Sequence, residues 1–402
     1  MDGALLIEHR DSASRARSGR LRLAHGEVRT PAFVPLATKG TVKGLLPGEV
    51  AVAGHEMVLG NTFHLFLEPG AELIAAHGGL HDFMGWRGPI ITDSGGFQVF
   101  SMGHGTVADK IKGRSAQGGG DRAGAILEIA EEGVRFRSYV DGSDHFMGPE
   151  TSMQVQAALG SDIALVFDEC TPFHVTREYT QESTARTHRW LERCLRWHAE
   201  HAPPGQLVYG IVQGGVYEDL RRESAQAVAA SGCAGIAIGG SLGQDKAQMY
   251  EVVGWATAEL DERRPRHLLG IGDVDDLIAG VELGIDTFDC AMPTRLARHG
   301  MALVPDPGNR WRVDLTKASA RSDQAPILDG CRCAACAGGH GRAYLRHLLR
   351  QHELTGMRLV TLHNLTFIAD LMADLRAAIA AGELPARAAA LRAGATPAQA
   401  GV

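Results

Sequence analysis

The feature that most constrains the fold is a series of eight short apolar segments, each of which ends in glycine or polar residues. They occupy residues 31–37, 57–62, 89–96, 162–170, 206–215, 234–240, 267–272 and 286–290. Segments with helical periodicity lie between most of them, at 150–159, 176–201, 216–230, 246–260 and 274–283. Continuous apolar runs indicate strands that are buried on both faces, as in parallel sheets. Eight such strands with intervening helices predict an α/β protein built as a (β/α)8 TIM-like barrel, with a doubly wound open sheet as the competing architecture.

Composition is that of a globular protein with a large core. The chain has 402 residues, 45% of them hydrophobic and 22% charged, which excludes a disordered or collagen-like chain. Seven cysteines, an odd number, argue against a disulfide framework. No apolar run approaches the ~20 residues that span a bilayer, and the N-terminus has no apolar stretch typical of a signal peptide. We therefore expect a cytoplasmic protein without a membrane partner. No glycine motif of the nucleotide-binding kinds opens a predicted helix, so we expect no organic cofactor.

Changes in composition along the chain predict four parts. Residues 1–300 form the barrel, which includes a long Gly-rich loop at 103–125. Residues 301–363 follow the eighth strand, carry a cysteine cluster and are predicted to form an inserted C-terminal metal-binding subdomain. Residues 364–384 contain a periodic helix that we expect to pack on the barrel, and the Ala/Gly/Pro-rich residues 385–402 are expected to be a flexible tail.

Charge is distributed unevenly. The net charge is −7, but residues 295–363 hold eleven Lys or Arg against five Asp or Glu, a local balance of +6 that leaves −13 for the rest. A basic segment on an acidic body suggests a local site for a polyanion. Chance clustering on a solvated surface gives the same pattern, so charge alone leaves the question open.

Acidic side chains follow three of the predicted strands, at Asp93, Asp168 and Asp289. The carboxyl ends of barrel strands carry the active site in this architecture. A single aspartate there often only caps the next helix, but two carboxylates in one pocket suit glycosidic chemistry, in which one attacks the anomeric carbon and the other moves the proton. The glycine pairs 214–215 and 239–240 fit either a flat ligand against the main chain or simple tight turns.

The cysteine cluster has the spacing C-x-C-x-x-C, at Cys331, Cys333 and Cys336. Histidines follow at positions 340, 347, 352 and 363. Three thiolates and one imidazole would complete a tetrahedral zinc site with no open position, which is a structural site. Spacing alone does not choose the histidine, and a set of unliganded thiols is the alternative. Four protein ligands also argue against a zinc hydrolase, because no position remains for a water molecule.

Together these motifs resemble those of the bacterial tRNA-guanine transglycosylases, also called queuine tRNA-ribosyltransferases, from about residue 20 to 382. The matching motifs are NTFHLFLEPGAE (61–72), TDSGGFQVFS (92–101), EEGVRFRSYVDGS (131–143), SDIALVFDECTP (161–172), YGIVQGG (209–215), IAIGG (236–240), TFDCAMPTR (287–295), CRCAAC (331–336) and TLHNL (361–365). The resemblance implies a (β/α)8 barrel with a zinc subdomain. It also implies exchange of the wobble guanine of GUN anticodons, in the Asp, Asn, His and Tyr tRNAs, for 7-aminomethyl-7-deazaguanine (preQ1) in queuosine biosynthesis.

The same resemblance implies roles for individual residues. Asp289 matches the nucleophile that forms a covalent ribosyl intermediate, Asp93 matches the general acid/base, and Asn61 matches a partner beside that pair. The expected base contacts are Ser94, Gly95, Gly96, Phe97, Asp168, Gln213, Gly239, Gly240 and Leu269. The expected RNA contacts are Gly270, Ile271, Gly272, Asp273, Val274, Asp275, Asp276, Thr294, Arg295, Leu296, Ala297 and Arg298. The expected ligands of one structural zinc ion are Cys331, Cys333, Cys336 and His363. The implied partners are the tRNA anticodon loop, the 7-deazaguanine base and a second copy in a homodimer.

The sequence departs from the family pattern near the base pocket. After Gly240 the segment SLGQDKAQ is one residue shorter than usual, and Gln244 stands where glutamate is expected. Leu269 and Asp273 replace a common methionine and lysine. Cys170 favours preQ1 as the incoming base, but the shorter loop could make room for queuine. Two further alternatives are a non-catalytic tRNA-binding partner subunit, which would lack the catalytic aspartates present here, and a DNA-modifying relative.

Overall fold

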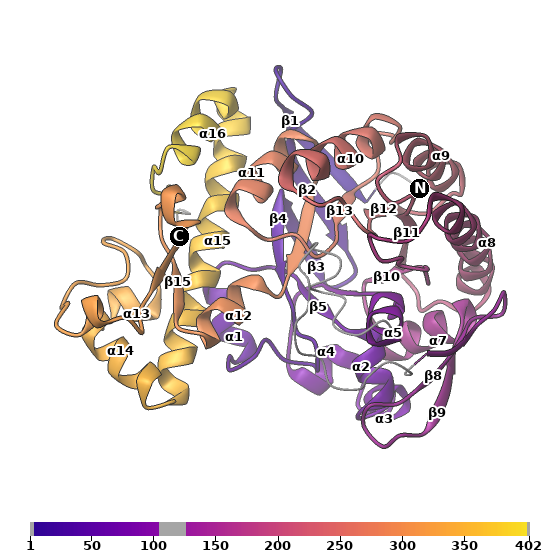
Figure 1. Ribbon diagram of the computed structural model, residues 1–402, viewed down its shortest axis with the longest axis horizontal. Helices are drawn as coiled ribbons and strands as arrows, with labels where there is room; N and C mark the ends of the chain where they lie inside the picture. The colour runs from indigo at the N-terminus through magenta and orange to yellow at the C-terminus, as the bar shows by residue number, and fades with distance from the viewer. Residues whose placement is uncertain (1–3, 104–125, 400–402) are drawn as a thin grey trace.

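The computed structural model describes residues 4–103 and 126–399, whose path is traced in Figure 1. At its centre, eight parallel strands form one sheet in the order β4-β14-β13-β12-β11-β10-β6-β5. A further parallel bridge joins Leu36 to Leu59 next to the two outermost strands, so the sheet closes into a barrel. The strands are β4 (Ala32–Pro35), β5 (Val58–Gly60), β6 (Ile90–Thr92), β10 (Ile163–Leu165), β11 (Leu207–Val212), β12 (Gly235–Ile238), β13 (Arg266–Leu268) and β14 (Thr287–Cys290). The predicted (β/α)8 barrel is confirmed.

Each barrel strand lies within one of the eight apolar segments or begins one residue before it. Strand β12 shows why such runs form the centre, since Ile236, Ala237 and Ile238 are all fully buried. Most strands are shorter than their apolar segments, because the glycine and polar residues at the segment ends leave the sheet as loops. These loops lie at the carboxyl ends of the strands, where the candidate site residues are found.

The five predicted helices are present and surround the barrel (Figure 1). They are α7 (Pro149–Leu159), α8 (Arg177–His201), α9 (Glu218–Ala230), α10 (Lys246–Ala258) and α11 (Val274–Glu282). Their starts follow the sequence chemistry, since the side chain of Thr176 accepts a hydrogen bond from Tyr179 N and that of Asp245 accepts one from Gln248 N. Shorter helices also lie in the outer layer: α1 (Pro47–Val52), α2 (Thr62–Leu67), α3 (Ala71–Ala76), α4 (Gly79–Met84), α5 (Gly96–Gly103) and α12 (Met292–Arg298).

Antiparallel strands outside the barrel were not predicted. An N-terminal sheet contains β1 (Leu5–Arg10), β2 (Arg17–Leu23) and β3 (Gly26–Thr30); a second contains β7 (Ile126–Ile129), β8 (Val134–Arg137) and β9 (Asp144–Met147); a third contains β15 (Met301–Leu303) and β16 (Arg312–Asp314). Strand β8 shows the reason. Val134 and Phe136 are buried whereas Arg135 and Arg137 are exposed, so the strand alternates instead of forming a continuous apolar run.

The C-terminal part differs from the prediction in two ways. Helix α15 (Leu354–Ala381) begins ten residues before position 364, so the expected boundary at 363/364 falls inside one continuous helix. The expected flexible tail instead begins with α16 (Leu384–Arg392), which packs on α15. Leu384, Ala388 and Leu391 are buried because their helical spacing forms one apolar stripe. The short elements η1 (Pro307–Asn309), η2 (Ala318–Ala320), α13 (Ala334–Ala337) and α14 (Arg342–Arg350) complete this part.

Helix α15 joins the cysteine-bearing segment to the barrel. It packs against α13 and α14 on one side and against α12 and β4 on the other, as Figure 1 shows. Although α15 has 28 residues, no helix within residues 4–103 and 126–399 is both long and apolar enough to cross a bilayer. The predicted loop at 103–125 falls almost entirely on residues 104–125, which lie outside the described residues.

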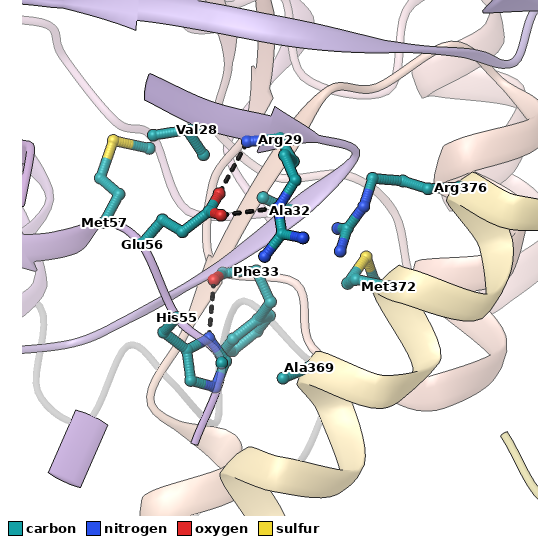
Figure 2. Close-up of a pocket in the computed structure, with 11 residues that line it drawn as sticks. Val28, Arg29, Ala32, Phe33, His55, Glu56, Met57, Ala369, Met372 and Arg376 are labelled. Atoms are coloured by element: carbon teal, nitrogen blue, oxygen red, sulfur yellow. Dashed lines mark hydrogen bonds and ion pairs between the residues drawn. The ribbon is translucent and has the colours of Figure 1, made fainter. Parts of the chain in front are cut away.

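A small cavity lies at the amino end of the barrel, beside the start of β4 and next to α15 (Figure 2). His55 lines it and contacts the carbonyl oxygens of Phe33 and Leu365 at 3.1 and 3.0 Å. Burial lowers the pKa of His55 to about 4, so the ring is neutral at physiological pH. The cavity holds about 10 Å³, room for one water molecule and not for a purine. The candidate active site therefore lies at the opposite end of the strands.

Candidate active site

The candidate catalytic and base-binding residues come from different strands and converge at the mouth of the barrel. Asp93 follows β6, Asp168 follows β10, Gln213 follows β11, Gly239 and Gly240 follow β12, and Asp289 lies in β14. Their hydrogen bonds form three networks, around Asp93, Asp168 and Asp289, and the charge of Asp289 acts on Asp93.

The carboxylate of Asp93 is half-buried and is held by donors on both oxygens. The backbone N–H of Thr62 donates to Oδ1 at 2.9 Å. The side-chain amides of Asn61 and Gln98 both donate to Oδ2, the latter at 3.1 Å. Asn61 is also the N-cap of α2, where its Oδ1 accepts a hydrogen bond from His64 N. The expected contact between Asn61 and the acid/base residue is therefore present, and the start of α2 orients both side chains.

Asp168 lies at the centre of a second network. Ser94 Oγ donates to its Oδ1 at 2.8 Å, and Gln213 Nε2 donates to its Oδ2 at 2.6 Å. The Ser94 hydroxyl in turn accepts a hydrogen bond from Gly96 N at 3.1 Å. Asp168, Gln213 and Ser94 are all at least 96% buried. The structure thus brings together three of the predicted base contacts, with buried polar groups that hydrogen-bond one another.

Burial changes the acidity of two of the aspartates. It raises the pKa of Asp93 to about 7, and the charge of Asp289 adds to this effect against the hydrogen bonds from Thr62 and Gln98. Burial also raises the pKa of Asp168 to about 6, against the hydrogen bonds from Ser94 and Gln213. A carboxyl group with a pKa near neutral pH is suited to both giving and taking a proton.

Asp289 is buried and contacts a residue that sequence reasoning missed. His267 Nε2 lies 3.2 Å from Asp289 Oδ1, and Gly270 N donates to the same oxygen at 3.1 Å. His267 Nδ1 lies 2.9 Å from Thr287 Oγ1. His267 opens the apolar run HLLGIG, in which the pattern predicts only a buried strand. The available signal was a polar side chain in an apolar run, one residue before the carboxyl end of β13.

Glycines are required where the backbone approaches these side chains. At Gly240, φ is +77° and an added Cβ would lie 2.2 Å from Gln213 Oε1. At Gly96 an added Cβ would lie 2.4 Å from Asp168 O. Gly95, with φ of +81°, forms the turn between Asp93 and α5. The backbone at Gly240 and Gly96 therefore packs directly against Gln213 and Asp168, with no room for a side chain.

Arg221 of α9 holds the Gly239–Gly240 segment in place, and it was not identified from the sequence. It is fully buried and donates hydrogen bonds to four carbonyl oxygens, those of Gly215, Val212, Gly239 and Ser241, at 2.7, 3.1, 2.8 and 2.8 Å. Burial lowers the pKa of Arg221 to about 9. One guanidinium thus ties the loop after β11 to the loop after β12.

The remaining pocket residues differ in exposure. Phe97 is 41% exposed, so part of its ring is accessible to a ligand. Leu269 packs close to Gly239, where an added Cβ would lie 3.1 Å from its Cδ1. Cys170 is buried, and burial raises the pKa of its thiol far above its ordinary value. A protonated, buried thiol is not suited to act as a nucleophile.

The expected RNA contacts divide into exposed and buried residues. Gly270 to Gly272 form the loop after β13, and Asp273 to Asp276 begin α11. The three aspartates already have partners: Asp273 pairs with Arg312, Asp275 with Trp311 and Lys246, and Asp276 with Tyr250 and Lys246. On α12 the side chain of Arg295 is exposed and that of Arg298 is half-buried, whereas Thr294 and Ala297 are buried and Leu296 is partly buried. Val274 is buried, as Ile271 is in part. The two arginines are therefore the side chains best placed to reach an anion.

The cysteine cluster and one histidine lie together away from the mouth. Cys331, Cys333, Cys336 and His363 form a group whose ligand atoms can hold a metal ion. The three Sγ atoms lie 3.7, 3.5 and 3.5 Å from His363 Nδ1. On the other side of the ring, His363 Nε2 lies 2.7 Å from Leu303 O. An Nε2–H that donates to this carbonyl leaves Nδ1 free as a ligand. His363 lies on α15, which explains why spacing along the chain could not select it.

Comparison with known proteins agrees with this geometry. The sequence model of the family described as queuine tRNA-ribosyltransferase matches residues 11–395. A queuine tRNA-ribosyltransferase of Roseiflexus sp. is 49% identical over 389 residues, covering 94% of this chain and 96% of its own. Those of Pelotomaculum thermopropionicum and Acidithiobacillus ferrooxidans are 46% and 48% identical, each with 94% of this chain covered and with 95% and 93% of their own. The chain therefore belongs to the queuine tRNA-ribosyltransferase family.

Proposed function

We propose that this enzyme, a tRNA-guanine transglycosylase, exchanges the wobble guanine of GUN anticodons for preQ1 through a covalent ribosyl-Asp289 intermediate. The tRNAs concerned are those for Asp, Asn, His and Tyr, and the step belongs to queuosine biosynthesis. One observation carries the proposal. Two carboxylates lie at the carboxyl ends of the barrel strands in different surroundings. One oxygen of Asp289 is held by His267 and Gly270, whereas the pKa of Asp93 is raised to about 7.

The reaction would proceed in two displacements at C1′ of the ribose. In the first, an oxygen of Asp289 bonds to C1′ as the C1′–N9 bond breaks, and Asp93 gives a proton to the departing guanine. In the second, Asp93 takes a proton from the incoming base, whose nitrogen bonds to C1′ as the ester to Asp289 breaks. The RNA backbone stays intact, and two inversions retain the configuration at the sugar.

Asp168 and Gln213 are suited to bind the purine edge. Each Asp168 oxygen accepts one hydrogen bond from the protein and keeps a lone pair for N–H donors of the base. The exposed ring of Phe97 offers a surface on which the base can stack. The base must leave the anticodon stack to reach this depth, which costs less in a single-stranded loop than in a duplex.

The segment that follows Gly240 supports our proposal that the incoming base is preQ1. Ser241 and Leu242, which follow Gly240, are both buried, and Arg221 holds Ser241 O. A segment that is held in this way leaves little room for a large substituent, so it favours preQ1, which is smaller than queuine. The alternative is queuine, because the segment after Gly240 is one residue shorter than usual. The presence of both Asp93 and Asp289, each with its polar partners, argues against a non-catalytic partner subunit.

We propose zinc as the metal of the Cys331, Cys333, Cys336 and His363 group. In a tetrahedral site with Zn–S of about 2.3 Å and Zn–N of about 2.0 Å, each sulfur lies roughly 3.5 Å from the nitrogen, and the observed separations are 3.5 to 3.7 Å. With four protein ligands the ion would be structural and would hold α13 against α15.

Arg295 and Arg298 on the neighbouring α12 would contact RNA phosphates, so the binding of tRNA should weaken as the salt concentration rises.

Base exchange into a tRNA(Tyr) transcript tests the proposal. Labelled guanine, preQ1 and queuine are supplied separately to the native enzyme and to Asp93→Asn and Asp289→Asn, with a transcript that carries adenine at the wobble position as control. We expect exchange only into the wobble-guanine transcript, preQ1 preferred, and activity lost in both variants. Preference for queuine would replace preQ1 by the alternative base. No exchange of any base, with tRNA still bound, would refute the enzymatic proposal, and stronger binding to duplex DNA would point to a DNA substrate.

A further inference from the structure

The two carboxylate oxygens of Asp289 lie in different surroundings. Oδ1 accepts a hydrogen bond from Gly270 N at 3.1 Å and lies 3.2 Å from His267 Nε2. Among residues 4–103 and 126–399, no group donates a hydrogen bond to Oδ2. One oxygen is therefore held from two sides, and the other has no hydrogen-bond donor among these residues.

His267 is itself held in one orientation. It lies on β13, which pairs in parallel with β14 so that His267 stands opposite Thr287. Thr287 and Asp289 are two residues apart on β14 and share one face of the strand. The imidazole bridges them, with Nδ1 2.9 Å from Thr287 Oγ1 and Nε2 facing Asp289. Since a carboxylate only accepts hydrogen bonds, Nε2 carries the proton. A flipped ring would place carbon atoms against both partners.

We propose that His267 is a positioning residue that, with Gly270 N–H, fixes Asp289 so that Oδ2 attacks C1′. This inference rests on the proposed role of Asp289 as the nucleophile. As the Oδ2–C1′ bond forms, the C1′–N9 bond breaks and its electron pair leaves with the guanine. Oδ1 then becomes the carbonyl oxygen of the ester, which still accepts both hydrogen bonds. When the incoming base displaces the ester, the same two donors stabilise the returning carboxylate.

His267 could act by donating a hydrogen bond to Asp289 or only by filling space, and two substitutions separate these roles. His267→Gln keeps an N–H near the position of Nε2, whereas His267→Leu fills similar volume with no donor. Thr287→Val is a third test variant, because it leaves His267 in place and removes only the partner that orients the ring. All three must bind metal and melt near the native temperature, which circular dichroism and metal analysis check.

The measurement is the single-turnover rate at which the enzyme becomes covalently attached to a labelled tRNA(Tyr) transcript on a denaturing gel, together with kcat and KM. We expect His267→Leu to slow attachment about 10- to 100-fold, as for loss of one hydrogen bond to a charged group. The KM for tRNA should change less than about twofold, because His267 does not face the RNA. His267→Gln should recover most of the rate, and Thr287→Val should lose several-fold.

The attachment rates of these variants decide the inference. Native attachment rates in His267→Leu would overturn it, and so would equal slowing in His267→Leu and His267→Gln, which would assign His267 to packing. If His267→Leu does not fold, the rates of His267→Gln and Thr287→Val decide. A rate close to native in the glutamine variant together with a reduced rate in the valine variant supports the positioning role. Native rates in both variants refute it. Absence of any covalent product in the native enzyme would instead refute the proposed function of Asp289 itself.

Discussion

Replacing Asp93 by asparagine should make the protein more stable at high pH, because the native fold disfavours the ionised form of this carboxyl group. Folding raises the pKa of Asp93 from 3.8 to about 7, mainly through burial. Each pKa unit corresponds to about 1.4 kcal/mol, so the shift amounts to about 4 kcal/mol. The Asp93 carboxyl group is therefore predicted to reduce the free energy of unfolding whenever it is ionised.

The sign follows from proton binding. Between pH 4 and pH 7 the unfolded chain has released the Asp93 proton whereas the native protein keeps it, so stability falls as pH rises through this window. The loss is absent below about pH 4 and complete above about pH 7. The amide of the Asp93→Asn variant cannot ionise, so the difference in stability between this variant and the native protein should grow with pH. Changes in the hydrogen bonds from Asn61 and Thr62 are constant offsets that cancel between two pH values.

Thermal unfolding at pH 5.5 and 8.5 measures this difference. Both pH values lie above the acid range in which the metal site proposed at Cys331, Cys333, Cys336 and His363 would release its ion. About 2 kcal/mol of the effect lies above pH 5.5, and an unfolding entropy of about 2.1 cal/mol/K per residue converts it to roughly 2–3 °C. Asp168→Asn is the matched control, because the pKa of Asp168 is about 6 and its gain above pH 5.5 should be under about 1 kcal/mol. A difference for Asp93→Asn that is flat, or that shrinks as pH rises, would refute the reasoning.

Three further predictions concern other parts of the molecule. Cys336→Ser should lose bound metal and lower the melting temperature by several degrees, since metal binding contributes to folding; elemental analysis with calorimetry checks both, and full stability without metal would contradict a structural site. Gly240→Ala should abolish base exchange while tRNA capture persists, because its Cβ would lie 2.2 Å from Gln213 Oε1; filter binding beside the exchange assay separates the two effects. Arg221→Met leaves the buried carbonyl oxygens of Gly215, Gly239 and Ser241 without their donor, while that of Val212 keeps the hydrogen bond from Gly239 N. It should therefore cost about 3 kcal/mol or more of unfolding free energy; a loss under about 1 kcal/mol in denaturant titration would show that water replaces the guanidinium.

The barrel was predictable from sequence because its strands are buried on both faces. Continuous apolar runs such as 234–240 are typical of a closed parallel sheet when eight of them alternate with helices. Strand β8 escaped prediction because it is solvated on one side and shows only four alternating residues. The start of α16 was mistaken for a flexible tail because Ala-rich composition hid the stripe of Leu384, Ala388 and Leu391. Composition averages over residues, whereas packing depends on their spacing.

The site was predictable where chemistry and position along a strand coincide. Asp93, Asp168 and Asp289 stand out because carboxylates are costly at the ends of apolar strands. His267 and Arg221 were missed because their roles depend on neighbours far along the chain, Asp289 for the histidine and the carbonyls of two loops for the arginine. His363 illustrates the same limit, since only the packing of α15 brings it to the cysteines.

The covalent intermediate is the central claim, and denaturing electrophoresis of the enzyme with a labelled tRNA(Tyr) transcript tests it most directly. The native protein should give an RNA–protein band that survives denaturation and disappears when excess guanine is added, because the second displacement then releases the RNA. Asp289→Asn, which keeps the shape of the side chain, should give no band while still capturing tRNA on a filter. An equally strong band from Asp289→Asn, or guanine exchange by the native enzyme that never passes through a covalent species, would contradict the account.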